Sequence, residues 1–206
     1  MAALLVVGIL GIGVWLATRP DPDAAIPPSA TSDEHGLAVG TGPVPVEIYL
    51  DFMCPACQQF DAASRPILEE YLAEGTVTVI YRPIAILNRY STTRYSTRAA
   101  AAAGCAADAG QLDPYVAALF TNQPQQGGAG LSDDQLVELG NSVGLGEEFA
   151  QCVRDGTYHD WAKLNTDAAA DRGVQATPTV FVDGQRLDPL SLDALAAAID
   201  RAAAGS

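Results

Sequence analysis

The sequence predicts an α/β fold with a helical insertion, preceded by an N-terminal transmembrane anchor, and three observations lead to this prediction. Two β-branched segments, residues 46–52 and 76–82, flank a stretch with helical periodicity, which is typical of a β–α–β unit. Alanine-rich stretches then run to about residue 172, before a last β-branched segment at residues 177–182. Residues 2–17, at the start of the chain, are apolar and carry no charge.

The apolar start, residues 1–18, is interpreted as a membrane anchor or a signal peptide. At about 1.5 Å per residue, a helix of this stretch spans roughly 24 Å, slightly less than a hydrocarbon core of ~30 Å. A signal peptidase prefers a small residue at the position that Trp15 takes if cleavage follows Ala17. We therefore favour an uncleaved anchor and keep a cleaved signal as the alternative. Either segment would export the rest of the chain.

Residues 19–35 have the composition of a flexible linker. They are rich in Pro, Asp and Ser, show no apolar periodicity, and include the pair Pro27 and Pro28. Such a segment buries too little apolar surface to fold alone. The folded domain is therefore expected to comprise residues 36–206.

The elements of that domain follow in order. We expect strands at residues 36–40 and 46–52, a helix at residues 55–73 ended by Gly75, and a strand at residues 76–82 parallel to the second. Four or five helices fill an insertion at about residues 90–172. A strand at residues 177–182 turns at Asp183-Gly184 into residues 185–187, and an amphipathic helix at residues 190–204 ends the domain.

The charge balance restricts the partners. The formal net charge is −14 at pH 7. Phosphate backbones and anionic surfaces repel such a chain, so nucleic acid is excluded as an expected partner.

The candidate redox site is the motif Cys54-Pro55-Ala56-Cys57, which follows a strand and opens a helix. A cysteine at a helix N-terminus faces unpaired backbone N–H groups and the positive end of the helix dipole, and both stabilise the thiolate. We expect Cys54 to be the nucleophile and Cys57 its resolving partner. The alternatives are half of a zinc site, for which no nearby histidine completes the ligands, and a static disulfide, whose loop is too small to stabilise much.

A second signal is Pro178, where the late strand begins. A cis Thr177–Pro178 bond would direct this turn at the cysteine pair. An ordinary trans proline at the edge of a sheet is the alternative, and the residues alone favour it because cis bonds are uncommon.

The segments YLDFMCPACQQF and ATPTVFVDG, with an alanine-rich helical region between them, resemble the DsbA-like branch of the thioredoxin superfamily, and the membrane-anchored actinobacterial members in particular. The resemblance runs from about residue 36 to residue 204. It implies a thioredoxin fold, Cys54 as the attacking thiol, Cys57 as its partner and Pro178 as a cis proline. It also implies that Thr177 pairs with the substrate backbone, and we expect Pro55 and Ala56 to contact substrate as well.

The same resemblance implies a structural disulfide between Cys105 and Cys152, with two separate buried thiols as the alternative. It implies oxidation of thiols in exported proteins at the extracytoplasmic face of the membrane, with no metal and no organic cofactor. The partner that reoxidises the pair would be a quinone-linked membrane protein, a DsbB or vitamin K epoxide reductase homologue. The Pro-Ala dipeptide lacks the histidine of the best-known members, so we expect a Cys54 pKa well below about 8.5 and a moderately oxidising potential.

Two carboxylates of the strand before the motif, Asp51 and Glu47, are candidates for proton transfer at Cys57. Asp51 is preferred because it lies closer to the motif in sequence. Two other functions are compatible with the same residues: a thiol reductase or isomerase, for example in cytochrome c maturation, and a copper-binding module without enzymatic activity.

Overall fold

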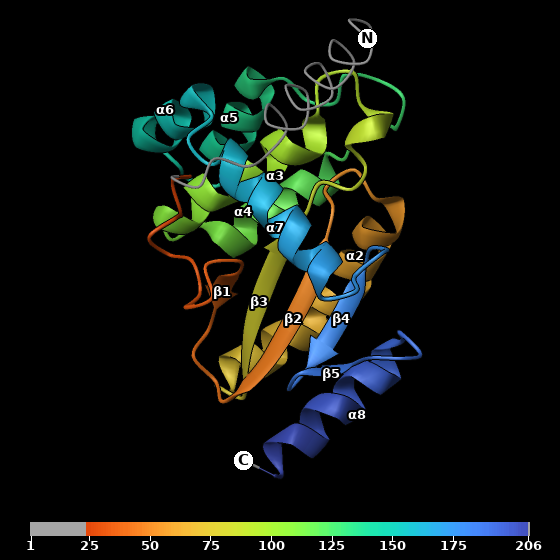
Figure 1. The fold of residues 1–206 in the computed structure, drawn as a ribbon. Helices are drawn as coiled ribbons and strands as arrows, with labels where there is room; N and C mark the ends of the chain where they lie inside the picture. Colours follow the sequence, from red (N-terminus) through yellow and green to blue (C-terminus); the bar gives the residue numbers. More distant parts are fainter. Residues whose placement is uncertain (1–23, 206) are drawn as a thin grey trace, which may run out of the picture.

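The structure is a computed structural model, and it describes residues 24–205 (Figure 1). Its helices and strands are, in chain order, β1 (Leu37–Val39), β2 (Val44–Leu50), α2 (Pro55–Ala73), β3 (Val77–Pro83), the 3₁₀ turn η1 (Asn88–Tyr90), α3 (Tyr95–Asp108), α4 (Leu112–Thr121), α5 (Asp133–Ser142), α6 (Glu147–Asp155), α7 (His159–Asp171), β4 (Thr179–Val182), β5 (Gln185–Arg186) and α8 (Leu192–Ala203).

The strands form one mixed sheet in the order β1-β3-β2-β4-β5. β2 and β3 are parallel and are joined by α2, so the predicted β–α–β unit is confirmed. The other neighbours in the sheet are antiparallel. β2 lies at the centre and is buried along most of its length, which explains its run of apolar residues. Its carboxyl end leads directly into the turn that carries Cys54.

Helices cover both faces of this sheet (Figure 1). α2 and α8 pack against each other and against the sheet, and the Tyr71 hydroxyl donates to Asp200 between them at 2.7 Å. α7 packs on β3, and a second apolar cluster that includes Tyr49, Ala169 and Phe181 lies beneath it. This arrangement agrees with the thioredoxin fold that the family resemblance implies.

The insertion forms a helical domain at one end of the sheet (Figure 1). α3 is its central helix and packs against α4, α5, α6 and α7. The alanines of α3 are almost all buried, because small side chains let the surrounding helices approach closely. A disulfide joins Cys105 of α3 to Cys152 of α6, with a Cα–Cα distance of 6.0 Å. The pairing is the one that the family resemblance implies.

The flexible linker proposed for residues 19–35 is wrong for the part that the structure describes. Ser29 donates to Asp108 at 2.8 Å, and the Trp161 indole donates to the carbonyl oxygen of Glu34 at 2.6 Å. Asp33 forms an ion pair with Arg82 at 2.7 Å. Residues 24–35 therefore dock on the domain. The contacts that hold them come from residues far along the chain, and the composition of the segment alone does not reveal these contacts. The expected anchor, residues 1–18, lies outside the described residues, and within residues 24–205 no helix is long and apolar enough to span a membrane.

Candidate active site

Cys54 ends the turn that joins the central strand β2 to helix α2. Its backbone N–H donates to the carbonyl oxygen of Asp51 at 2.9 Å, which closes the turn. Cys54 is the N-cap residue of α2, and its own carbonyl oxygen accepts from Cys57 N–H at 3.0 Å. Pro55 is the first residue of the helix. An N–H group at this position would have no acceptor within the helix, so the lack of an N–H in proline costs no hydrogen bond. The first turn of α2 also directs the backbone N–H groups of Ala56 and Cys57 toward the Cys54 sulfur.

The two cysteines are free thiols in this structure and differ in accessibility. Cys54 is 7% exposed and Cys57 1% exposed. Pro55 and Ala56, between them, are exposed. A partner can therefore reach the Cys54 sulfur across Pro55 and Ala56, whereas the Cys57 sulfur is almost fully buried.

The Pro178 turn lies beside Cys54 because β4 runs antiparallel to β2. Tyr49, near the end of β2, pairs with Thr179, the first residue of β4. The residues just before β4 are thereby brought next to the turn that follows β2. The Thr177–Pro178 bond is cis, and the Cys54 thiol donates to the carbonyl oxygen of Thr177 at 3.2 Å. The structure thus brings together Cys54, Thr177 and Pro178.

The environments of the two thiols shift their pKa values in opposite directions. The Cys57 thiol hydrogen-bonds to the Cys54 sulfur and contributes most to lowering the Cys54 pKa to about 5. The Thr177 hydroxyl and the N–H groups of Cys57 and Ala56 add to this effect, against burial, which acts in the other direction. Burial, followed by the Cys54 sulfur itself, raises the pKa of Cys57 far above its ordinary value. Near neutral pH the reduced pair therefore carries one thiolate, on Cys54.

Asp51 lies buried directly beneath the turn. Its carboxylate accepts from the N–H groups of Met53 and Leu87, each at 2.9 Å, and the residue is 0% exposed. Burial raises the Asp51 pKa to about 6, and the neighbouring Cys54 charge acts in the same direction. The backbone N–H of Asp51 points to the Cys57 sulfur and favours its thiolate. Asp51 therefore belongs to the site and titrates close to neutral pH.

Glu47, the other carboxylate considered from the sequence, has a different environment. Arg172 binds its two oxygens at 2.6 and 2.8 Å, and Arg82 binds it at 2.5 Å. These guanidinium groups outweigh burial and hold the pKa of Glu47 below its ordinary value. A carboxylate bound by two arginines is a poor proton carrier, so the structure favours Asp51.

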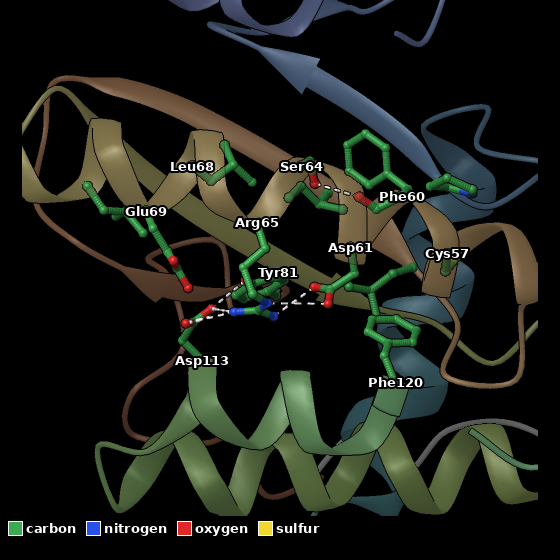
Figure 2. Close-up of a pocket in the computed structure, with 14 residues that line it drawn as sticks. Cys57, Phe60, Asp61, Ser64, Arg65, Leu68, Glu69, Tyr81, Asp113 and Phe120 are labelled. Carbon is green, nitrogen blue, oxygen red and sulfur yellow. Dashed lines mark hydrogen bonds and ion pairs between the residues drawn. The ribbon is translucent and has the colours of Figure 1, made fainter. Parts of the chain in front are cut away.

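A small cavity of about 10 Å³ lies behind Cys57, between α2, α4 and the sheet (Figure 2). Phe60, Phe120 and Pro178 are among the residues that line it. Figure 2 shows Asp61 and Arg65 on the same side of α2 as Cys57, and Asp113 reaching up from α4. The cavity has room for about one water molecule.

Sequence reasoning missed two residues of the site, Gln123 and Gln126. The Gln123 amide donates to the carbonyl oxygens of Phe52 and Cys54, each at 3.0 Å. Gln126 donates to the carbonyl oxygen of Met53 at 3.2 Å. Both lie in the loop after α4, about 70 residues from the motif, and no pattern in the sequence links the two segments.

Comparison with known proteins supports the assignment of the fold. The chain matches the Thioredoxin family over residues 34–201. The crystal structure of oxidised Mycobacterium tuberculosis DsbA is 32% identical, with a TM-score of 0.73 over 82% of this chain and 92% of that chain. The reduced disulfide bond oxidoreductase DsbG of the same organism is 32% identical, with a TM-score of 0.70 over 84% of this chain and 85% of that one.

The curated relatives include two kinds of protein. The serine/threonine-protein kinase PknE of M. tuberculosis is 30% identical over 160 residues, which are 71% of this chain and 28% of the kinase. The chain therefore spans less than a third of that relative. The probable disulfide bond formation protein D of Bacillus cereus is 25% identical over 98% of this chain and 92% of its own length. From the family match and the DsbA structure together, the chain belongs to the thioredoxin family, in its DsbA-like branch of thiol–disulfide oxidoreductases.

Proposed function

We propose that this protein is a thiol–disulfide oxidase that introduces disulfides into exported proteins outside the cytoplasm. The observation that carries the proposal is the low pKa of Cys54, about 5, beside a Cys57 whose pKa is strongly raised. Stabilising the Cys54 thiolate stabilises the reduced pair, so the Cys54–Cys57 disulfide is readily given up. A strong tendency to give up a disulfide is the property that an oxidase needs.

The reaction starts from the Cys54–Cys57 disulfide. A substrate thiolate attacks the Cys54 sulfur, a substrate–Cys54 bond forms, and Cys57 leaves as a thiolate and takes up a proton. A second substrate thiolate then attacks the substrate sulfur of this mixed disulfide, and Cys54 leaves as a thiolate. Two substrate thiols have become one disulfide, and their two electrons reside on the reduced cysteine pair.

Substrate is proposed to bind over the exposed side of Cys54. Pro55 and Ala56 are exposed there, and Thr177 and Pro178 border the sulfur on the other side. In the mixed disulfide, the backbone of Thr177 would pair with an extended substrate chain. The contacts would be mainly to backbone atoms, which suits an enzyme that acts on many sequences.

Asp51 is proposed to supply the proton to Cys57. Its pKa of about 6 means that a fraction of the carboxyl groups hold a proton near neutral pH. In the reverse direction, when the pair is reoxidised, the same carboxylate would accept the proton of Cys57.

Reoxidation requires an acceptor for two electrons. We assign this role to a quinone-linked membrane protein of the DsbB or vitamin K epoxide reductase type, and we place the protein at the membrane through residues 1–18. A docked segment at residues 24–35 would leave only a short tether between such an anchor and the domain. A short tether would hold Cys54 close to a membrane-bound reoxidant.

The proposal is tested by mixing the oxidised protein, without oxygen, with a reduced peptide that contains two cysteines. We expect one peptide disulfide for each protein molecule, and none from the Cys54→Ser or Cys57→Ser variants. If the oxidised protein leaves the peptide reduced while the reduced protein cleaves the peptide disulfide, the protein is a reductase and the proposed direction is wrong.

A further inference from the structure

The turn that carries the nucleophile presents three successive carbonyl oxygens to the helical domain. They belong to Phe52, Met53 and Cys54, and the side chains of all three residues are buried. Buried carbonyl groups need hydrogen-bond donors, and residues in a turn between a strand and a helix do not obtain all of them from the sheet or the helix. The donors that the structure provides here are glutamine side chains.

Gln123 has the central position among these donors. Its single amide nitrogen bridges the carbonyl oxygens of Phe52 and Cys54, each at 3.0 Å, and so connects the residues on both sides of Met53. Gln126 completes the set by donating to Met53. The carbonyl oxygen of Cys54 is shared with the N–H groups of Cys57 and Gln58, at 3.0 and 3.2 Å. Gln123 therefore acts on the peptide group where the first turn of α2 is closed.

The loop that carries Gln123 is itself held at both ends. At its start, Gln123 N–H donates to the carbonyl oxygen of Phe120 at 3.2 Å, and the Gln58 amide of α2 donates to the same oxygen at 2.6 Å. At its end, Gly127 N–H donates to the backbone carbonyl oxygen of Tyr90 at 2.7 Å. The rings of Phe120 and Phe52 pack with their centroids 5.2 Å apart. The glutamine is thus presented by a fixed loop.

We infer that Gln123 is a positioning residue for the redox site, through which the helical domain holds Cys54 where its thiolate is stabilised. The groups that stabilise the Cys54 thiolate are the Cys57 thiol, the Thr177 hydroxyl and the N–H groups of Cys57 and Ala56. Each of these contacts depends on the rotation of the Cys54 backbone. Because Gln123 binds the peptide groups on both sides of that turn, it restricts this rotation without touching the sulfur.

The test is the thiol pKa of Cys54 in Gln123→Met, which keeps the length of the side chain and removes the amide. The thiolate absorbance of the reduced protein is titrated against pH. We expect the Cys54 pKa to rise by about one unit, a roughly tenfold loss of thiolate relative to thiol. The matched control is Gln125→Met, two residues away on the exposed side of the same loop, which should titrate like the unmodified protein.

A second variant separates positioning from folding. Gln126→Met removes the donor to Met53 and leaves the Cys54 carbonyl untouched, so it should lower the melting temperature with a smaller change in pKa. If Gln123→Met unfolds, Gln123→Asn is titrated instead. It retains an amide that is too short to bridge both carbonyls, and we expect an intermediate pKa.

The inference about Gln123 rests on the proposed redox role of Cys54. Different results of the titration would contradict the proposed function and the inference about Gln123. A Cys54 pKa near 8.5 in the unmodified protein contradicts the proposed function. A low pKa there that stays unchanged in folded Gln123→Met or Gln123→Asn overturns only the inference about Gln123.

Discussion

At the scale of single residues, the site depends on a difference between two cysteines three positions apart. Cys54 is the N-cap residue of a helix and lies against the Cys57 thiol, the Thr177 hydroxyl and backbone N–H groups, whereas Cys57 lies one turn further in and is 1% exposed. The helix terminus therefore stabilises a negative charge on the Cys54 sulfur, whereas burial disfavours a charge on the Cys57 sulfur. The first turn of α2 therefore makes Cys54 a nucleophilic thiolate and keeps Cys57 as a buried thiol.

This difference makes the stability of the reduced protein depend on pH. The Cys54 pKa is lowered in the folded state, so the stabilisation is fully present above the pKa of the unfolded thiol and is lost as the pH falls toward about 5. The oxidised protein has no Cys54 thiol to titrate. We expect the reduced form to lose about 1.4 kcal/mol of its unfolding free energy, relative to the oxidised form, for each pH unit between about 8 and about 5.

Urea denaturation of both forms at pH 8, 6.5 and 5 measures this effect. A difference between the two forms that stays constant over this range would mean that Cys54 has an ordinary pKa.

The role of Asp51 predicts a change in kinetics. Asp51→Asn can neither donate nor accept the proton of Cys57, so we expect the attack of substrate thiol on the disulfide to slow by about a hundredfold. The pH dependence centred near 6 should disappear from the rate profile. Stopped-flow measurement of the attack rate between pH 5 and 8 checks this, with the exposed Asp134→Asn as control. An unchanged profile in Asp51→Asn would remove Asp51 from the mechanism.

At the scale of the elements, α2 is held against α4 by a partly buried ion network. Arg65 of α2 donates to both oxygens of Asp113 at 2.8 Å and to Asp61 at 2.7 Å, and the Tyr81 hydroxyl donates to Asp113 at 2.6 Å (Figure 2). This contact joins the redox helix to the helical domain below Cys57. Removing the cation would leave two carboxylates facing each other in a poorly solvated space.

Arg65→Met should therefore lower the unfolding free energy by about 2–3 kcal/mol. Arg154→Met is the matched control, because Arg154 pairs with Glu147 at the surface, where an ion pair contributes about 0–1 kcal/mol. Urea denaturation of the two variants gives the comparison. Equal losses in both would show that the Arg65 network does not hold α2 to α4.

The disulfide between α3 and α6 stabilises the helical domain at a distance from the redox pair. Its cysteines are 47 residues apart, and closing a loop of this length stabilises the folded state by roughly 4 kcal/mol on the chain-entropy account. Replacing Cys105 and Cys152 together by alanine should remove about that much unfolding free energy. The Cys54 titration should stay the same, and a shifted titration would contradict a purely structural role for this disulfide.

At the scale of the whole molecule, the sequence predicts most of the strands and helices and their order along the chain. Strands β2, β3 and β4 and helix α2 have strong local patterns. A turn at Gly75 separates α2 from β3, and a turn at Asp183-Gly184 separates β4 from β5. The cysteine pair is predictable for the same reason, since the residues that form its helix terminus are neighbours in sequence. Pro178 is reached only through the family resemblance, because the pairing of β4 with β2 that brings it to Cys54 is not local.

Other features could not be predicted because their partners are distant. Residues 24–35 have the composition of a linker, yet Asp33 and Glu34 bind Arg82 and Trp161. Gln123 looks like an ordinary polar loop residue until the fold brings it to Phe52 and Cys54. In each case the binding partner lies far along the chain, so local sequence patterns give no indication of the contact.

The reduction potential of the Cys54–Cys57 pair tests the central claim most directly. The protein is equilibrated with glutathione buffers of known ratio, and the fraction oxidised is measured. A thiolate stabilised as in this structure predicts a potential above about −180 mV, which would drive disulfides into exported proteins. A value near −270 mV would contradict the account, because a pair of that potential passes electrons to disulfides and breaks them.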